Sequence, residues 1–262
     1  MNLECDAQIA AQFRSRSQQV RVATEAWFGS QSYCLACKSN QLSTSKPNAI
    51  ARDFSCPLCG QSYELKSSER VEGKRIVDGA YATMLERIRA HDAPALILLR
   101  YLRGKASADS TWIIDRLVAI HPVFLTDAVV EARRPLSAHA KRAGWQGCNL
   151  RLDRIPPEGR IALICEGKAI DRTHTRSLYE SSKRLASIDP DMRGWTATVL
   201  SIVRDIGRTH FRLSEVYAHR QKLEEAFPNN HHVEAKIRQQ LQVLRNLGYL
   251  HFSSRGVYEV IS

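Results

Sequence analysis

The chain has no apolar run near the roughly 20 residues that a helix needs to cross a bilayer. Its longest apolar stretch, APALILLRYL, has the length of a strand and is interrupted by Arg100. The N-terminal stretch MNLECDAQIAAQFRSRSQQ contains no apolar core of the kind found in signal peptides. We therefore expect no membrane partner and a cytoplasmic location.

Acidic residues are too few to balance the basic ones. The 262 residues include 27 Asp and Glu against 38 Lys and Arg, which gives a formal net charge of +11. An excess of this size favours a polyanionic partner, and nucleic acid is the expected one, although charge says nothing about the fold. The hydrophobic fraction of 44% is ample for the core of one large domain or two modest ones.

The seven cysteines are an odd number, which with a cytosolic setting argues against a disulfide framework. Four of them form two CxxC pairs separated by 18 residues, at the spacing of a four-thiolate zinc ribbon: Cys34, Cys37, Cys56 and Cys59. A pair of redox dithiols is the alternative, but such dithiols usually stand alone before a helix. Because thiolates fill all four positions, the predicted Zn²⁺ is structural.

The second CxxC pair predicts the turn of an antiparallel hairpin, with Pro57–Gly60 as its loop. This register places Phe54 opposite Tyr63 and Asp53 opposite Glu64. Cross-strand partners share a face, with Cβ atoms about 4.5–5.5 Å apart, and the period of two along a strand puts Lys66 on that face. Two acids and a lysine are thus predicted to lie together.

Two carboxylates this close repel unless a cation lies between them, and oxygen ligands with room for waters suit Mg²⁺. Such an ion polarises a phosphodiester and lowers the pKa of a bound water. Lys66 can hold or deprotonate that water and offset developing charge. The pattern therefore predicts Asp53, Glu64 and Lys66 as catalytic residues of a hydrolase. The alternative is a solvated strand face with an ordinary ion pair.

Apolar periodicity predicts a mixed α/β fold for the first part of the chain. Helices are expected within residues 3–31 and over 76–92, the latter with Ala80, Met84, Leu85 and Ile88 on one face. Strands are expected over 95–102, 110–115 and 160–167. A polar stretch with a Pro- and Gly-containing break, residues 170–192, predicts a boundary between domains 1–188 and 189–262.

Beyond this break the pattern changes to three amphipathic helices, expected over 194–207, 213–227 and 233–248. Two short strands follow and turn at Ser254–Gly256. Three helices and a hairpin in this order are typical of a winged-helix module, a relative of the helix-turn-helix whose third helix enters the major groove of DNA.

The arrangement of Asp53 and Glu64-x-Lys66 resembles the core of the PD-(D/E)XK nucleases. The stretches QSYCLAC, YELKS, DGAYATM, KRAGWQGCN, RGWT and IRQQLQVLR resemble the DpnI-like methyl-directed (type IIM) restriction endonucleases in the same order, over nearly the whole chain. One departure from the superfamily pattern is that Arg52, not proline, precedes Asp53.

The resemblance implies an α/β (α+β) PD-(D/E)XK nuclease domain with an inserted four-cysteine zinc site, followed by an α+β winged-helix domain. It implies Mg²⁺-dependent cleavage of double-stranded DNA at GATC sites that carry N6-methyladenine, with Asp53 and Glu64 as metal ligands and Lys66 acting on the nucleophile. We expect a monomer in solution. A non-catalytic zinc-ribbon and winged-helix regulator, or a methylation-independent nuclease of the same fold, are the alternatives.

Two segments are candidates for reading DNA. Residues 131–149 concentrate basic side chains beside one tryptophan, suited to binding phosphates and an extra methyl group: Arg133, Arg134, Lys141, Arg142 and Trp145. By resemblance, the matching tryptophan senses methylated adenine; a buried core tryptophan is the alternative.

The third C-terminal helix offers Lys236, Arg238, Gln239 and Gln240 to the major groove, where Gln pairs with adenine and Arg with guanine. A solvated helix face is the alternative. Arg255 at the wing tip is expected to contact phosphate. Trp195 is left open between a core position and a contact with the modified base.

Overall fold

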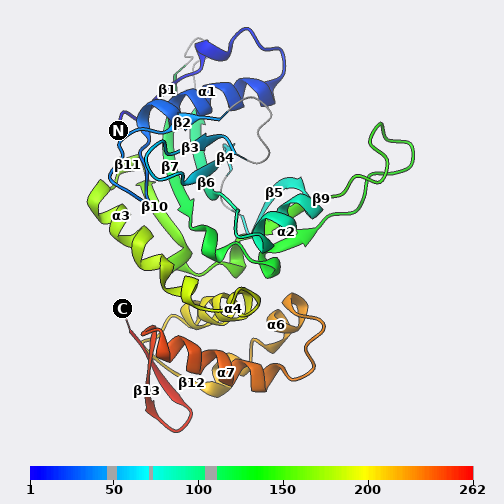
Figure 1. Ribbon diagram of the computed structural model, residues 1–262, viewed down its shortest axis with the longest axis vertical. Helices are drawn as coiled ribbons and strands as arrows, with labels where there is room; N and C mark the ends of the chain where they lie inside the picture. Colours follow the sequence, from blue (N-terminus) through cyan, green and yellow to red (C-terminus); the bar gives the residue numbers. More distant parts are fainter. Residues whose placement is uncertain (46–51, 71–72, 104–110, 262) are drawn as a thin grey trace. The chain divides into compact units, whose positions relative to one another are not determined.

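The computed structural model describes residues 1–45, 52–70, 73–103 and 111–261 (Figure 1). It forms two compact units, each assembled from separate segments of the chain. The first comprises Met1–Gly73, Asp92–Pro122 and Arg160–Ser182; the second comprises Lys74–His91, Val123–Gly159 and Lys183–Ser262. The units divide the chain differently from the boundary at 188/189, which remains a prediction.

A mixed sheet forms the centre of the first unit (Figure 1). Its order is β11 (Lys168–Ala169), β10 (Arg160–Cys165), β7 (Thr111–Ile120), β6 (Ala95–Arg103), β4 (Ser62–Ser68), β3 (Phe54–Ser55) and β2 (Ser43–Thr44), with β1 (Glu4–Asp6) also paired to β7. Strands β4 and β6 run parallel, and the other pairs are antiparallel. The three predicted strands are therefore confirmed over Ala95–Leu102, from Thr111 to Asp115 and over Arg160–Cys165, while Ser110 of the second prediction lies outside the described residues.

The core of this unit lies between the sheet and helix α1 (Arg16–Gln31). Strand β6 is a nearly continuous apolar run, as expected for a strand buried on both faces, and its Ile97 and Leu99 are fully buried. From α1, Phe28 packs against Phe54 with ring centroids 5.0 Å apart. The helical prediction for residues 3–31 holds only from Arg16, because β1 and the 3-10 helix η1 (Gln8–Ala10) precede α1. Helix α3 (Arg172–Ser181) packs against β10.

The second unit begins with a small sheet of order β5 (Arg75–Ala80), β9 (Gly147–Arg151) and β8 (Val130–Ala132). Along the chain, helix α2 (Tyr81–Arg89) follows directly after β5. The prediction of one helix over 76–92 is thus wrong for its first part. Val77 is 61% exposed whereas Asp78 is buried, which is the alternation of a strand. Pairing with β9, distant in sequence, overrides the local helical pattern, and Gly79 disfavours helix there.

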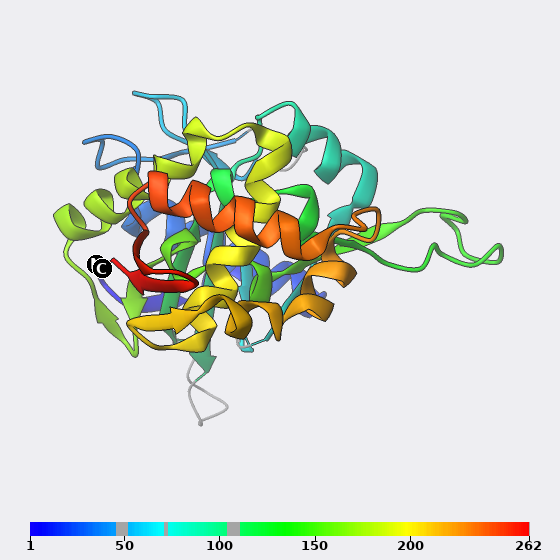
Figure 2. The ribbon, with the colours of Figure 1, turned by 90° about the horizontal axis from the view of Figure 1, so that it is seen from below.

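The remainder of the second unit has the winged-helix order. Its elements are α4 (Pro190–Ile206), β12 (His210–Arg212), α5 (Leu213–Tyr217), α6 (Arg220–Ala226), α7 (Val233–Asn246), β13 (Leu250–Ser254) and β14 (Val257–Val260). The strands form a sheet of order β12-β14-β13, and α7 packs across α4 (Figure 2). The predicted helix over 213–227 is two helices, α5 and α6. Gly256, at φ +74°, makes the wing turn in a conformation that favours glycine.

Short 3-10 helices complete the connections: η2 (Pro122–Phe124), η3 (Asp127–Val129), η4 (Leu152–Arg154), η5 (Pro157–Gly159) and η6 (Ser182–Ser187). Among the described residues, we find no helix with the length and apolar character needed to span a bilayer.

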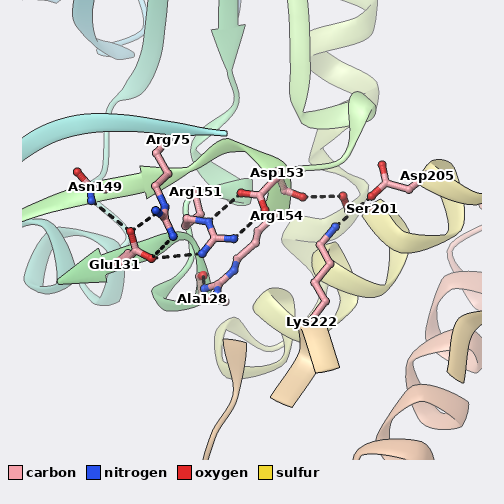
Figure 3. Close-up of polar contacts among 10 residues, drawn as sticks. All are labelled: Arg75, Ala128, Glu131, Asn149, Arg151, Asp153, Arg154, Ser201, Asp205 and Lys222. Carbon is pink, nitrogen blue, oxygen red and sulfur yellow. Dashed lines mark hydrogen bonds and ion pairs between the residues drawn. The ribbon is translucent and has the colours of Figure 1, made fainter. Parts of the chain in front are cut away.

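A charged network lies along the small sheet of the second unit (Figure 3). Glu131 on β8 accepts hydrogen bonds from Asn149 and Arg151 and pairs with Arg75, while Arg151 also makes two bonds to Asp153. Burial alone would raise the pKa of Glu131, but the Asn149 hydrogen bond and the two arginines outweigh it and lower that pKa. Burial is likewise outweighed at Asp153, where Arg151 lowers the pKa.

These lowered pKa values predict a pH-dependent contribution to stability. A carboxylate whose pKa is lower in the folded state stabilises the fold above its unfolded pKa, and that stabilisation is lost as the pH falls through the folded value. We expect Arg151→Ala to lower the free energy of unfolding by about 1.5–3 kcal/mol at pH 7, and by much less near pH 3. Urea titrations at several pH values measure this difference. Arg16→Ala, which removes an exposed pair with Glu69, is the control. An Arg151 effect of equal size at every pH would contradict the assignment.

Candidate functional site

The hairpin around the second CxxC pair has the predicted register. Phe54 pairs with Tyr63 and Ser55 with Ser62, and the Cys56 amide donates to the Gln61 carbonyl at 2.9 Å. The turn closes with a 2.9 Å bond from the Gly60 amide to the Cys56 carbonyl, and Gly60 has φ +76°. The CxxC turn therefore sets which residues of β3 and β4 face each other.

Asp53 lies where this ladder ends. Its amide donates to the Tyr63 carbonyl at 3.0 Å, and its carboxylate Oδ2 accepts the Leu65 amide at 2.8 Å. The side chain thus takes the place of a backbone acceptor from the neighbouring strand. The strand pairing ends at Phe54 and Tyr63 and does not include Asp53 and Glu64, but the Asp53 carboxylate is held against the backbone between Glu64 and Lys66.

Glu64 and Lys66 lie two residues apart on β4, and the Lys66 Nζ is 2.6 Å from the Glu64 Oε1. Glu64 is only 7% exposed, and its register partner on β6 is Leu96. Tyr63 and Leu65 belong to the core that α1 covers, on the opposite face. A buried carboxylate is costly even when it is paired, so such a pair marks a candidate functional site.

This donor set suits a hard divalent cation. The carboxylates of Asp53 and Glu64 could supply oxygen ligands, and Glu64 already holds the ammonium group of Lys66. Mg²⁺ bound by these oxygens would leave coordination positions for water and for a phosphate oxygen. The arrangement is chemically able to activate a water beside a phosphodiester.

The four paired cysteines gather into one cluster, as predicted. Their Sγ atoms all lie within 4.8 Å of one another, with 3.5 Å between Cys34 and Cys59 and 3.6 Å between Cys37 and Cys56. These distances are too long for disulfides, and all four thiols are free. Tetrahedral zinc with Zn–S bonds of about 2.3 Å places its sulfurs about 3.8 Å apart, so the cluster could hold zinc.

Neighbouring groups orient the thiols. The Tyr63 hydroxyl lies 3.3 Å from the Cys34 Sγ and accepts the Leu35 amide at 2.9 Å. From α3, Arg176 donates to the carbonyls of Cys34 and Ser39. The cluster is thereby attached to β4 and to α3 as well as to its own two turns.

The amides of the second turn favour a thiolate. Burial opposes ionisation of the Cys56 thiol, but hydrogen bonds from the Cys59 and Leu58 amides and from the neighbouring thiols lower its pKa to about 6. A readily formed thiolate is what a metal ligand requires.

The basic segment of the second unit forms a long arm between β8 and β9 (Figure 1). Trp145 is half-buried where the arm returns to β9, and the Arg142 guanidinium lies 4.6 Å from its ring centroid. The indole packs so closely on Gly147 that a Cβ there would lie 2.9 Å from it. Trp145 is therefore not a fully buried core residue. The four basic residues of the prediction are exposed: Arg133, Arg134, Lys141 and Arg142.

The residues of helix α7 that were predicted to contact DNA lie partly on the surface and partly in the core. Arg238 and Gln239 are exposed and Lys236 is half-buried, while Arg255 is exposed at the wing turn. Gln240 is fully buried, and its Oε1 accepts the Thr196 hydroxyl at 2.6 Å. The prediction of Gln240 as a DNA contact is therefore wrong.

The helical period explains this correction, because Gln240 shares the inner face of α7 with Ile237, Leu241 and Leu244. Gln242, which the prediction did not include, is exposed on the outer face. Placing successive residues 100° apart around the helix axis, starting from the apolar residues, puts Gln242 on the outer face.

Trp195 belongs to the core. It is 6% exposed and stacks on Phe227, with ring centroids 4.1 Å apart. Of the two alternatives left open for this residue, the structure supports packing, and contact of Trp195 with DNA is wrong for this conformation.

The structure combines a mixed sheet that carries a buried carboxylate–lysine pair, a four-cysteine cluster and a winged helix-turn-helix, the features expected of a nuclease that binds DNA. The model of the Dam-replacing family, DpnI, matches residues 1–188, and the model of the Dam-replacing HTH domain matches residues 191–260. The chain belongs to the Dam-replacing family, and the two matches together are those of a DpnI-like methyl-directed restriction enzyme. Membership implies a nuclease whose C-terminal domain binds DNA.

Proposed function

We propose that the chain is a Mg²⁺-dependent type II restriction endonuclease with a PD-(D/E)XK catalytic domain. Its substrate is double-stranded DNA at GATC sites that carry N6-methyladenine. The observation that carries the proposal is the attachment of the Asp53 carboxylate to the Leu65 amide, between Glu64 and Lys66 on one strand. A purely DNA-binding regulator has no use for this arrangement.

Each catalytic residue has a distinct task. Asp53 and Glu64 would hold Mg²⁺, which when bound would polarise the scissile phosphate and lower the pKa of a water. Lys66, as an ammonium group, would orient the attacking water and offset the charge that develops on the phosphate oxygens. The Leu65 amide keeps Asp53 from rotating away from the site.

The cysteine cluster has a structural task in this proposal. Cys34, Cys37, Cys56 and Cys59 bind one Zn²⁺ and leave it no open position for a substrate. Zinc fixes the turn after β3, and the turn fixes the register that brings Asp53 to β4. Metal binding and catalytic geometry are thereby coupled.

The second unit supplies the DNA contacts. On the arm between β8 and β9, Arg133, Arg134, Lys141 and Arg142 neutralise phosphates, and the partly exposed indole of Trp145 contacts the methyl group of the modified adenine. On the winged helix, Lys236, Arg238 and Gln239 approach the major groove, and Arg255 contacts phosphate. The protein acts as a monomer in solution.

Incubation with plasmids tests this function. A plasmid with fully methylated GATC sites and its unmethylated counterpart are each incubated with the protein in Mg²⁺ or in EDTA. We expect cutting of the methylated plasmid in Mg²⁺ only. Failure to cut it would leave the regulator as the explanation, and equal cutting of both plasmids would indicate a methylation-independent nuclease.

A further inference from the structure

Tyr63 lies on β4 one residue before Glu64, on the strand that also carries Lys66. Its side chain is 1% exposed and belongs to the core that α1 covers. Its backbone pairs with Phe54, and its carbonyl accepts the Asp53 amide at 3.0 Å. The backbone of Tyr63 is therefore part of the hydrogen bonding that brings Asp53 to β4.

The hydroxyl of Tyr63 lies at the first CxxC pair, which is not the pair that forms the turn between β3 and β4. It accepts the Leu35 amide at 2.9 Å and lies 3.3 Å from the Cys34 Sγ. Leu35 and Cys34 are both buried, so both contacts are made away from bulk water. One side chain thus joins the first CxxC pair to the strand of Glu64 and Lys66.

The direction of the contact with sulfur follows from the chemistry of the two groups. A phenol has one proton to donate and two acceptor positions, and the Leu35 amide takes an acceptor position. The proton stays available for Cys34. A cysteine that binds a metal is a thiolate, which accepts hydrogen bonds and cannot donate them. With metal bound, Tyr63 is therefore the donor and Cys34 the acceptor.

A second buried tyrosine lies near the same thiols. Tyr179 of α3 is fully buried and interacts electrostatically with Cys34 and Cys59. Its hydroxyl has no hydrogen-bond partner among the described residues. Helix α3 packs against β10, and β7 and β6 lie between β10 and β4 in the sheet. Tyr179→Phe thus removes a hydroxyl near the thiols without removing a described hydrogen bond to β4, which makes it a matched comparison for Tyr63.

We propose that Tyr63 is a positioning residue of the nuclease site. Its hydroxyl holds the Cys34 thiolate and the Leu35 amide against β4, and its backbone holds Asp53 beside that strand. The second CxxC pair sets the turn, and Tyr63 fastens the strand itself to the first pair. This proposal rests on the proposed function and deepens it, because it names the side chain through which the cysteine cluster acts on the catalytic residues.

Tyr63→Phe keeps the ring and removes the hydrogen bond to sulfur. Competition of the full-length chain with a chelator measures zinc affinity, which we expect to fall about 10- to 100-fold, the usual effect of losing a bond to a metal ligand. In protein loaded with Co²⁺ in place of zinc, the sulfur-to-cobalt charge-transfer band should move to longer wavelength. A thiolate that has lost a hydrogen bond gives up its electrons more easily, and a role in packing alone would leave this band in place.

The position of the catalytic groups is measured in the same variant at saturating zinc. We expect the Asp53 and Leu65 amides to exchange with deuterium faster than in the unaltered protein, as followed by mass spectrometry of short fragments. Single-turnover cleavage of a methylated duplex in Mg²⁺ should be roughly 10- to 100-fold slower, because small displacements of catalytic groups are costly. Affinity for the same duplex without Mg²⁺ should not change, because Tyr63 contacts no DNA in this proposal.

Two variants control these results. Tyr101 of β6 is also buried, and its hydroxyl accepts Arg103 at 3.4 Å; Tyr101→Phe should leave zinc affinity, amide exchange and cleavage unchanged. Tyr179→Phe at saturating zinc should leave exchange and cleavage unchanged. An unshifted cobalt band and normal exchange in Tyr63→Phe, or equally slow cleavage by Tyr179→Phe, would overturn the proposal. If Tyr63→Phe shifts the band and speeds exchange but the unaltered protein never cuts methylated DNA, the nuclease proposal fails and the connection through Tyr63 stands.

Discussion

Lys66→Ala is expected to bind methylated DNA as the unaltered protein does and to cut it about 10²- to 10⁴-fold more slowly in Mg²⁺. Lys66 lies 2.6 Å from Glu64 and has the position to act on a water bound beside it. An interaction that strengthens only in the transition state affects the rate and not the affinity for the substrate. The measurements are single-turnover cleavage of a methylated duplex and anisotropy of the same duplex in EDTA.

The structure offers a matched control for this loss. Lys168 on β11 is an exposed lysine of the same sheet, and Lys168→Ala should cut at the normal rate. A folding defect is excluded if the thermal midpoint of Lys66→Ala stays close to that of the control. Normal cutting by Lys66→Ala would show that this lysine has no catalytic task.

Removal of zinc is expected to abolish cutting and to destabilise the protein strongly. One Zn²⁺ per chain should be found by elemental analysis. A zinc-selective chelator used in excess Mg²⁺ should stop cleavage, because the turn that sets the β3–β4 register would lose its cross-link. Structural zinc sites contribute many kcal/mol, so a loss of at least about 5 kcal/mol is expected, or at least about 10 °C in thermal midpoint.

Single substitutions localise this effect. Cys56→Ser should reproduce the loss of zinc, of thermal stability and of cleavage together. Cys165→Ser, at an exposed cysteine outside the cluster, should change none of the three. Full zinc content in Cys56→Ser, or cleavage that survives chelation, would remove the proposed coupling between the cluster and the catalytic strand.

The hairpin was the most predictable part of the chain because its signals are local. The second CxxC motif defines a turn. Side chains alternate between the two faces of the strand that follows, so Tyr63 and Leu65 face the core and Glu64 and Lys66 face the other side. Sequence could not show that the ladder stops at Phe54, nor that Asp53 is then held by the Leu65 amide. That detail depends on a side chain replacing a backbone acceptor.

The errors arise where distant contacts decide the outcome. Strand β5 has a locally helical pattern, and only its pairing with β9, which lies far along the chain, makes residues 75–80 extended. The Gln240 amide is able to hydrogen-bond a base, but Gln240 lies on the buried apolar face of α7, where it bonds to Thr196. Trp195 was undecidable from its neighbours in sequence, because its stacking partner Phe227 lies on a later segment.

The position of the catalytic metal tests the account most directly. Mn²⁺ can replace Mg²⁺ and is located in crystals by its anomalous scattering, here with uncleaved methylated DNA and Lys66→Ala protein. The account predicts a Mn²⁺ ion bound at once by carboxylate oxygens of Asp53 and Glu64, at distances of about 2.0–2.3 Å. An ion elsewhere in the chain, or carboxylates of these two residues that share no ion, would contradict it.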